Sequence, residues 1–258
     1  MLKLAIGFIT YGETTAKYLP YFLPTLKEAA EKSGTEYKIF AIDNTEARDN
    51  ENARFIENNF RDINFERPEK NLGFARAYNK MINKAGAEYF LALNPDMLLE
   101  AEAIEKMIKT MENDVALGSV SPKVLKWDFS AKKKTNIIDT CGIKMLRGLK
   151  FVDAGQGKID DGSFNEAEIL GPSGAAAMYK IKALEKVRAG AGEYFDERFF
   201  MYKEDCDLAY RLHLAGYKSK CVNEAIIYHD RTAGGNGEGN FKTALNRKNK
   251  SKLIKEWS

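Results

Sequence analysis

The sequence predicts an α/β fold in which a doubly wound, mostly parallel sheet is flanked by helices. Apolar runs typical of buried strands alternate with helical patterns over the first 120 residues, an order that builds parallel sheets through right-handed crossovers. Between residues 123 and 169 the alternation gives way to short apolar pieces separated by five glycines. This segment predicts a small antiparallel β insertion that serves as an active-site flap.

The expected strands and helices follow from two periodicities. Short apolar runs predict strands over residues 2–10, 37–42, 63–65, 89–93 and 115–120. Apolar residues that recur every three or four positions predict helices over residues 24–31, 52–60, 73–84 and 101–111. Pro24 suits the first position of its helix. Asn94-Pro95 ends the run before it, because the residue before a proline avoids helical geometry.

The second half of the chain returns to longer elements. Strands are expected over residues 174–179, 218–222 and 226–228, and helices over 182–188 and 204–215. Gly216 is a good C-terminal stop for the second of these helices. The glycine-rich stretch 234–239 is expected to be a mobile loop before a C-terminal helix. Since no linker divides the chain, we expect one domain over residues 1–258.

Composition is that of an ordinary globular protein, with 44% apolar and 30% charged residues. The net charge of +3 arises from 40 basic and 37 acidic residues, so no nucleic-acid partner is expected. The basic runs 132–134 and 247–252 are expected to be solvated. For the second run, contact with an anionic membrane surface is the alternative.

Cysteine usage and the N-terminus favour the cytoplasm. The three cysteines form no C-x-x-C pair and are expected to be reduced thiols. Residues 1–10 are too short for a secretory signal, and no run approaches the roughly 20 apolar residues of a spanning helix. Peripheral contact at the inner face of the cell membrane stays open.

Asp96 is the first candidate for chemistry. It follows the run 89–93 at the carboxyl end of a central strand, where open α/β sheets bind their ligands. A carboxylate there suits a divalent cation that carries a phosphate. In the alternative, an Asx-Pro turn, Asp96 only helps to start the following helix.

Two segments upstream carry further polar residues. Asp43-Asn44 ends another strand and offers acceptors to a base or ribose, or forms an Asx turn. In the segment 71–79, Gly73 would let the backbone approach a ligand, and Arg76 is long enough to reach a diphosphate. The alternatives are a helix-start glycine and a surface cation.

Asp205 lies in the first turn of the helix expected over residues 204–215. It shares one helix face with Leu208, Ala209 and Leu212, so it lies at the N-terminal end of a buried apolar stripe. A carboxylate in that position is shielded enough to accept a proton. First-turn acids that stabilise the helix dipole are the alternative, which suits Glu204 and Asp207. Arg211 is spaced to pair with Asp207.

His229 ends the last expected strand and is one of two histidines in the chain. A lone histidine after a strand is often structural. With Asp96 it would instead complete a carboxylate–imidazole site for manganese or magnesium.

In this order, the segments resemble the family 2 glycosyltransferases, inverting enzymes of the GT-A fold. The resemblance spans residues 2–230 and is closest to the rhamnosyltransferase-like branch that builds bacterial cell-surface polysaccharides. The segments that carry it are 71–79, 93–96, 171–175, 195–208 and 228–229. Since the chain stops within a helical pattern, we also expect the natural protein to continue into a membrane-proximal segment, as relatives often do.

The resemblance implies a role for each matching position. Asp96 and His229 would bind Mg²⁺ or Mn²⁺, and Asp205 would be the general base. Residues 1–121 would form the nucleotide-sugar-binding half and residues 122–233 the acceptor and catalytic half. The residues expected at the donor and cofactor site are Thr10, Tyr11, Asp43, Asn71, Gly73, Arg76, Asn94, Asp96, Gly174, Ala175 and Glu204.

The implied reaction is sugar transfer from a nucleotide diphosphate sugar, with dTDP-rhamnose as the expected donor, to a glycan or lipid-linked saccharide. A sugar-phosphate nucleotidyltransferase is the alternative, but residues 7–13 lack the basic, glycine-rich loop that it needs. A nicotinamide-dependent dehydrogenase is excluded because no G-x-G-x-x-G follows the first strand. An inactive carbohydrate-binding relative is disfavoured because Asp96, Asp205 and His229 are all present.

Overall fold

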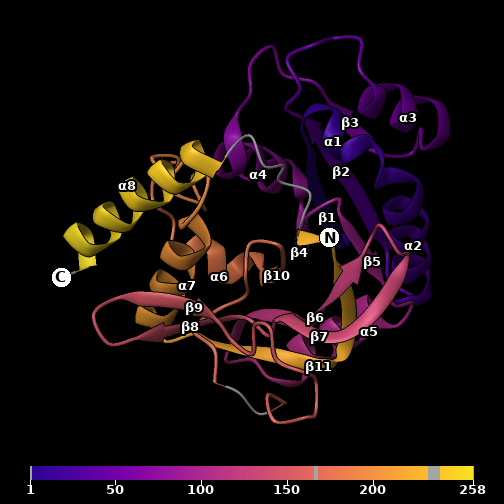
Figure 1. Ribbon diagram of the computed structural model, residues 1–258. Helices are drawn as coiled ribbons and strands as arrows, with labels where there is room; N and C mark the ends of the chain where they lie inside the picture. The colour runs from indigo at the N-terminus through magenta and orange to yellow at the C-terminus, as the bar shows by residue number, and fades with distance from the viewer. Residues whose placement is uncertain (1, 166–167, 232–238, 258) are drawn as a thin grey trace.

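The structure, a computed structural model, describes residues 2–165, 168–231 and 239–257 (Figure 1). Within those residues the central sheet has nine strands in the order β3-β2-β1-β4-β10-β6-β11-β5, with β7 paired to β6, and β8 and β9 form a separate hairpin. The strands are β1 (Leu2–Thr10), β2 (Tyr37–Asp43), β3 (Asn64–Glu66), β4 (Ala87–Leu93), β5 (Met97–Leu99), β6 (Leu117–Asp128), β7 (Lys133–Thr140), β8 (Ile143–Leu146), β9 (Lys150–Asp153), β10 (Ala176–Lys180) and β11 (Lys218–His229). The helices are α1 (Gly12–Ala16), α2 (Leu19–Lys32), α3 (Glu51–Asn59), α4 (Gly73–Ala85), α5 (Ala103–Asn113), α6 (Ile181–Lys186), α7 (Glu204–Leu214) and α8 (Gly239–Trp257).

The strand pairs that position the site are mostly parallel. β1 pairs in parallel with β2 and β4, and β6 pairs in parallel with β11. β10 runs antiparallel between β4 and β6, so its amino end lies at the same edge as their carboxyl ends. The predicted mostly parallel sheet is therefore confirmed. The small antiparallel insertion is confirmed as well: it consists of β7 and the β8–β9 hairpin.

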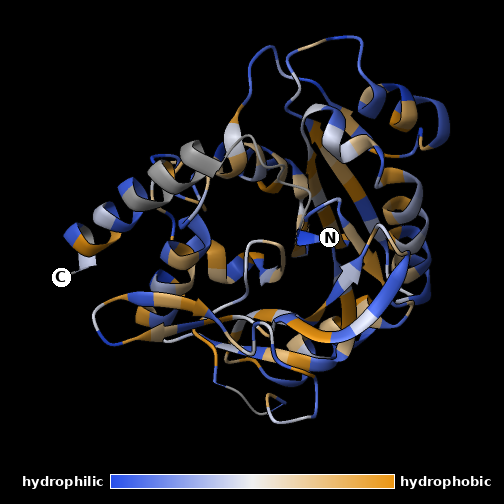
Figure 2. Cartoon of the chain, viewed as in Figure 1, coloured by the Kyte–Doolittle hydropathy of each residue, from blue (hydrophilic) through white to orange (hydrophobic). Residues whose placement is uncertain are grey.

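Helices cover both faces of this sheet (Figure 1). One apolar core joins the sheet to α2, α3 and α5, and a second joins it to α4, α6 and α7. Successive residues of a strand point to opposite faces, so in β1 Leu4 and Ile6 belong to the first core and Ala5 to the second. Figure 2 shows the apolar strands enclosed by helices with polar outer surfaces. Polar side chains are thus left for the strand ends.

The first long helix differs from its prediction. α2 begins at Leu19, Pro20 lies in its first turn, and Pro24 lies inside it. The prediction that Pro24 starts this helix was wrong. The buried stripe of α2, which includes Phe22 and Leu26, outweighs the one backbone hydrogen bond that Pro24 cannot donate.

Two differences concern the strands at the far edge of the sheet. The two expected closing strands form one strand, β11, with an irregularity between Val222 and Ile226. The short strand β5 was not expected, and it follows Asp96 directly. Residues 234–238 of the glycine-rich stretch lie outside the described residues, and α8 begins at Gly239. In the described part of the chain, no helix has both the length and the apolar character needed to cross a membrane.

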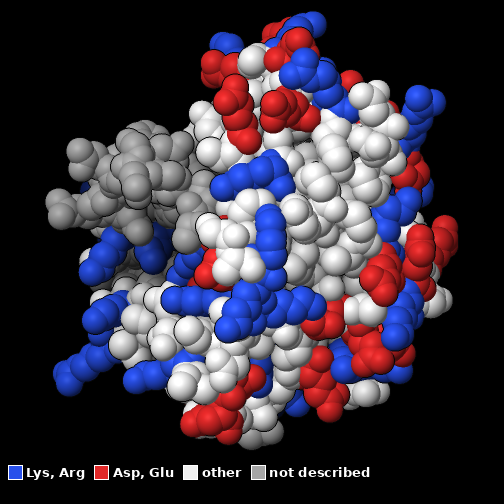
Figure 3. Space-filling model, turned by 45° about the vertical axis from the view of Figure 1, so that its right-hand side comes forward, with Lys and Arg blue, Asp and Glu red and all other residues white. Residues whose placement is uncertain are grey.

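Surface charge is mixed in sign. On the face drawn in Figure 3, Lys and Arg gather across the middle, and Asp and Glu lie mainly toward the edges. The basic run 132–134 is exposed, as expected. Within it, the Lys132 ammonium lies 3.1 Å from the ring centre of Phe129, so this cation also packs against an aromatic face.

Candidate active site

Asp96 and His229 meet at the carboxyl edge of the sheet. Asp96 directly precedes β5, and the antiparallel pairing of β5 with β11 places Met97 opposite His229. The backbone N–H of Asp230 donates to the carbonyl of Asp96 at 3.0 Å. Asp96 Oδ1 consequently lies 3.2 Å from His229 Nε2, and both side chains are buried. Strand pairing therefore brings together the two residues expected to bind a metal ion.

Asp139 supports the imidazole of His229 from its other side. His229 Nδ1 lies 2.8 Å from Asp139 Oδ2, and Asp139 is wholly buried. Burial disfavours the imidazolium, but the carboxylates of Asp96 and Asp139 outweigh burial and raise the pKa of His229 to about 10. Sequence reasoning missed Asp139, and the available signal was a single acid inside the otherwise uncharged segment 137–141.

The Asp96–His229 pair fits one side of a divalent-cation site. Asp96 Oδ1 is buried, and apart from its ion pair with His229 it accepts no hydrogen bond from a described residue. A carboxylate oxygen with an imidazole nitrogen suits Mn²⁺ and accommodates Mg²⁺. Among the residues that the structure describes, no group of three or more His, Cys, Asp or Glu side chains is arranged to hold a metal ion. The remaining ligands would therefore have to be substrate oxygens and water.

Asp205 is held in the first turn of α7 by two backbone groups. Its Oδ2 accepts from the N–H of Gly174 at 3.0 Å, and its Oδ1 accepts from the N–H of Cys206 at 2.8 Å. Leu208 and Leu212 on the same helix face are buried, which confirms the predicted apolar stripe. A Cβ at Gly174 would lie 3.3 Å from Asp205 Oδ2, so the absence of a side chain there leaves this carboxylate room.

One cavity of about 780 Å³ joins these side chains, a volume typical of small-molecule sites. Its walls come from the ends of β4, β10 and β11, from β9, and from the turn that leads into α7. The residues predicted for the site that line it are Asn94, Asp96, Gly174, Ala175, Glu204, Asp205 and His229. Arg231, Tyr202 and Lys203 also line it and were not predicted. Because Asp153 of β9 lines the cavity too, the insertion borders the site.

Glu204 is buried next to Asp205 and lines the same cavity. Its Oε2 accepts no hydrogen bond from the described residues. Burial, with the negative charge of Asp205 added, raises the pKa of Glu204 well above its usual value. The protonated form of Glu204 is therefore favoured, and it adds no second negative charge beside Asp205.

A second polar cluster lies at the ends of β1 and β2. The parallel register places Thr10 beside Asp43, and Thr10 Oγ1 donates to Asp43 Oδ1 at 3.0 Å. The N–H of Thr45 donates to the same oxygen at 3.2 Å, which is an Asx turn, and Asn50 Nδ2 donates to Asp43 Oδ2 at 2.8 Å. Tyr11 is 48% exposed. None of Thr10, Tyr11 and Asp43 lines the cavity described above, so their contacts with a nucleoside stay predictions.

The segment 71–79 packs against the loop before α7. Asn71 Oδ1 accepts from the N–H of Gly73 at 2.8 Å, and Gly73 has a φ of +70°. A Cβ at Gly73 would lie 2.4 Å from the carbonyl oxygen of Phe200, so protein backbone approaches this glycine. Arg76 is exposed, and its Nε lies 2.8 Å from Glu197 Oε2. Neither Asn71, Gly73 nor Arg76 lines the cavity, and their contacts with a donor stay predictions.

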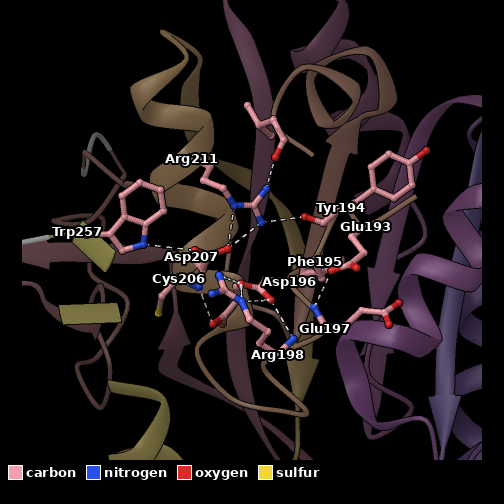
Figure 4. A network of polar contacts seen from close by, with 12 residues as sticks. Glu193, Tyr194, Phe195, Asp196, Glu197, Arg198, Cys206, Asp207, Arg211 and Trp257 are labelled. Carbon is pink, nitrogen blue, oxygen red and sulfur yellow. Dashed lines mark hydrogen bonds and ion pairs between the residues drawn. The ribbon is translucent and has the colours of Figure 1, made fainter. Parts of the chain in front are cut away.

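A buried ion pair anchors α7 (Figure 4). Arg211 Nη2 lies 2.7 Å from Asp207 Oδ2, as the spacing of the two residues predicted. Arg211 also donates to the carbonyls of Val187 and Tyr194. The indole N–H of Trp257 in α8 donates to Asp207 Oδ1 at 3.3 Å. Contacts with Val187, Tyr194 and Trp257 therefore hold α7, the helix that carries Asp205, in place.

Comparisons with known proteins bear on this geometry. A family model described as Glycosyl transferase family 2 matches residues 6–188. The chain is similar to the solved structure of the mannosyltransferase PcManGT from Pyrobaculum calidifontis in complex with GDP-Man and Mn²⁺, with a TM-score of 0.67, 15% identity, and coverage of 98% of this chain and 64% of that one. It is also similar to TarS 1-349 from S. aureus, with a TM-score of 0.59, 14% identity, and coverage of 95% and 69%. No curated protein sequence matches.

At these identities the two structures confirm the GT-A fold. This chain spans 64% of the length of the mannosyltransferase. The family match runs from β1 through α6, and it includes Asp96 and Gly174 but ends before Asp205 and His229. Because the match covers well over half of the sequence and agrees with the motifs and the fold, the chain belongs to glycosyl transferase family 2.

Proposed function

We propose that this protein is an inverting, metal-dependent glycosyltransferase that moves a sugar from a nucleotide diphosphate sugar to a hydroxyl group of a glycan or lipid-linked saccharide. The single cavity that receives Asp96, His229 and Asp205 from separate elements carries the proposal. Its lining offers Asp96 and His229 for a cation and, in the same cavity, the carboxylate of Asp205. These are the groups that one displacement at an anomeric carbon requires.

Asp205 is the proposed general base. Backbone N–H groups orient both of its oxygens, and each oxygen keeps a further lone pair for an incoming hydroxyl group. Asp205 takes the proton as the hydroxyl oxygen attacks the anomeric carbon from the face opposite the diphosphate. The new glycosidic bond forms as the bond to the diphosphate breaks, and the configuration inverts. No covalent glycosyl-enzyme is needed.

Asp96 and His229 would hold Mg²⁺ or Mn²⁺. When bound, the cation offsets the negative charge of the departing diphosphate, a large term in enzymes of this kind. Asp139 keeps the imidazole ring oriented through Nδ1, and the ion would replace the proton that Nε2 carries in the metal-free protein. The Mn²⁺ in the mannosyltransferase complex supports this proposal.

The proposed donor is dTDP-rhamnose, on the strength of the sequence motifs. The GDP-Man in the mannosyltransferase complex makes GDP-mannose the second donor to test, followed by uridine-diphosphate hexoses. Thr10, Tyr11 and Asp43 would face the nucleoside. They lie at the ends of β1 and β2, and β1 is the neighbour of β4, the strand that leads to Asp96.

Donor binding and transfer can be tested in turn. Thermal-shift measurements with Mn²⁺ and each sugar nucleotide identify the donor, because a bound donor raises the Tm by mass action. With that donor, Asp205→Asn should lower the transfer rate by at least about 100-fold, while donor affinity changes by less than about twofold. Asp96→Ala should lose Mn²⁺-dependent donor binding. Normal turnover by Asp205→Asn would reject the proposal.

Two other functions predict different products. A nucleotidyltransferase would release pyrophosphate from a sugar phosphate and a nucleoside triphosphate. An inactive binding protein would bind a sugar nucleotide without hydrolysing or transferring it. Assays for pyrophosphate and for free nucleoside diphosphate therefore separate the three functions.

We also propose peripheral contact with an anionic membrane at the cytoplasmic face, through a hairpin–helix surface formed by residues 144–150 and the end of α8. Met145, Leu146 and Ile254 are exposed there by 37%, 45% and 40%. They border a groove of about 410 Å³ between the β8–β9 hairpin and α8, which Arg147 and Trp257 also line.

Cations lie within this hairpin–helix surface. Lys144, Arg147 and Lys150 lie in the hairpin, and Lys250 lies one helical turn before Ile254. Apolar side chains beside cations suit the interface of an anionic bilayer. Sedimentation with phosphatidylglycerol vesicles should exceed sedimentation with phosphatidylcholine vesicles. Leu146→Asp should abolish the difference, and equal sedimentation of the wild type with both vesicles would contradict the proposal.

A further inference from the structure

The turn that leads into α7 has a rare backbone conformation. Tyr202 and Lys203 have φ angles of 69° and 78°, in the left-handed region that residues with a side chain seldom adopt. Both residues line the cavity. Lys203 is also the N-cap of α7, and among the described residues no side-chain hydrogen bond caps this end of the helix. The position of Asp205, two residues later, therefore depends on a turn that neither glycine nor a local cap stabilises.

Asn249 of α8 holds this turn from outside the cavity. Its Nδ2 donates to the carbonyl of Met201 at 2.9 Å and to the carbonyl of Tyr202 at 2.8 Å. Because both partners can only accept, the hydrogen bonds also settle which atom of the amide is the nitrogen. The side chain is wholly buried, and its Oδ1 accepts no hydrogen bond from the described residues. The contacts of this amide are thus concentrated on the two carbonyls of the turn.

The turn belongs to a loop over residues 199–203, and the other end of this loop is also held by a hydrogen bond. The N–H of Phe74 in α4 donates to the carbonyl of Phe200 at 2.8 Å. α8 itself is seated by Leu253, which is buried in one cluster with Phe199 and Cys206. The loop 199–203 is therefore bracketed between α4 and α8, and α8 lies beyond the residues that the family model matches.

We propose that Asn249 is a positioning residue for sugar transfer. By fixing the carbonyls of Met201 and Tyr202, it keeps the left-handed turn in place and so directs Asp205 into the cavity. This inference rests on the proposed role of Asp205 as the base. Asn249 is wholly buried and does not line the cavity, so we place it outside direct contact with the donor and the acceptor. Its loss should therefore lower kcat and leave donor affinity unchanged.

The test compares variants of α8 that differ in what they remove. Asn249→Ala removes both hydrogen bonds, and Asn249→Asp keeps the volume but turns a carboxylate toward two carbonyl oxygens. Leu253→Ala weakens the docking of α8 and leaves Asn249 intact. Lys248→Ala changes an exposed neighbour and should behave as the wild type. Trp257 fluorescence and circular dichroism show which variants keep α8 docked.

Two measurements decide the outcome. Hydrogen exchange of the free protein should become faster in residues 198–206 in both Asn249 variants, more than in Leu253→Ala. In transfer assays, kcat should fall at least about tenfold in the Asn249 variants, with a donor Kd within about twofold of the wild type, because a small displacement of a catalytic group has large effects on rate.

Each contrary result has a distinct meaning. Unchanged exchange in residues 198–206, unchanged kcat, or an equal fall of kcat in a Leu253→Ala variant whose α8 stays docked would overturn the role of Asn249. Absence of sugar transfer by the wild type with every donor would instead reject the proposed function. The exchange experiment needs no donor, so it tests the contact with the turn in either case.

Discussion

Replacing Gly73 with alanine would test how tightly the start of α4 packs against the loop that precedes α7. Gly73 has a φ of +70°, and a Cβ there would lie 2.4 Å from the carbonyl oxygen and 2.6 Å from a ring carbon of Phe200. The first neighbour is backbone, so it cannot move without moving the loop. The same loop carries the turn that presents Asp205.

The expected loss of stability has two parts. The left-handed conformation costs an alanine about 1–2 kcal/mol relative to glycine. Overlap with a packed neighbour adds about 1–3 kcal/mol, which gives about 2–5 kcal/mol for Gly73→Ala. Gly34 provides the matched control, because its φ is +65° and nothing lies within 4 Å of its Cβ position. Gly34→Ala should therefore lose only the first part, about 1–2 kcal/mol.

Urea unfolding of both variants measures the two free energies of unfolding. In thermal unfolding, each kcal/mol lost should lower the Tm by about 2–4 °C in a chain of this size. Gly73→Ala should also transfer sugar more slowly, because a shifted Phe200 carbonyl displaces the loop before α7. Gly34→Ala should transfer sugar at the normal rate. Equal losses of stability in the two variants would refute the steric reasoning.

Three further predictions concern the site and its supports. Asp139→Asn should weaken Mn²⁺ binding by about 10–100-fold in titration calorimetry, because the metal-facing imidazole loses its orienting carboxylate, and unchanged affinity would argue against that role. Because burial raises the pKa of Glu204, the native state keeps a proton that the unfolded state releases above about pH 4.3. The wild type should therefore lose stability relative to Glu204→Gln as the pH rises above about 5, by up to about 1.4 kcal/mol per pH unit. A difference in the free energy of unfolding that does not change with pH would contradict the raised pKa. Arg211→Leu removes the cation that pairs with the buried Asp207 and should lower the free energy of unfolding by about 3–5 kcal/mol. Arg76→Ala breaks an exposed pair and should lower it by less than about 1 kcal/mol. Similar losses in the two variants would show that burial does not decide what an ion pair contributes.

Local features of the chain were readable in advance. β1, β2 and β4 appear as apolar runs, and the apolar stripe of α7 follows from its three-and-four spacing. The pairing of Asp207 with Arg211 depends only on residues four apart on one helix. Such features are encoded by neighbours a few residues away, so packing elsewhere in the molecule changes them little.

At α2 and near Asp96, tertiary packing produced a structure that the local sequence pattern does not predict. Pro24 reads as the start of a helix, but buried side chains on both sides of it continue the helix through this position. A helix was expected soon after Asp96, but β5 comes first, because β11 offers it a partner. Neither outcome is visible without knowing which elements lie next to these segments.

Residue types and strand ends in the sequence determined which carboxylates and which histidine lie at the carboxyl edge of the sheet. Only the tertiary structure decided which residues support these side chains. Asp139 contacts His229 across 90 residues of sequence, and Asn249 contacts Met201 across 48. Contacts over such separations depend on strand register and helix docking, which arise from the packing of the whole core and not from the pattern of any one segment.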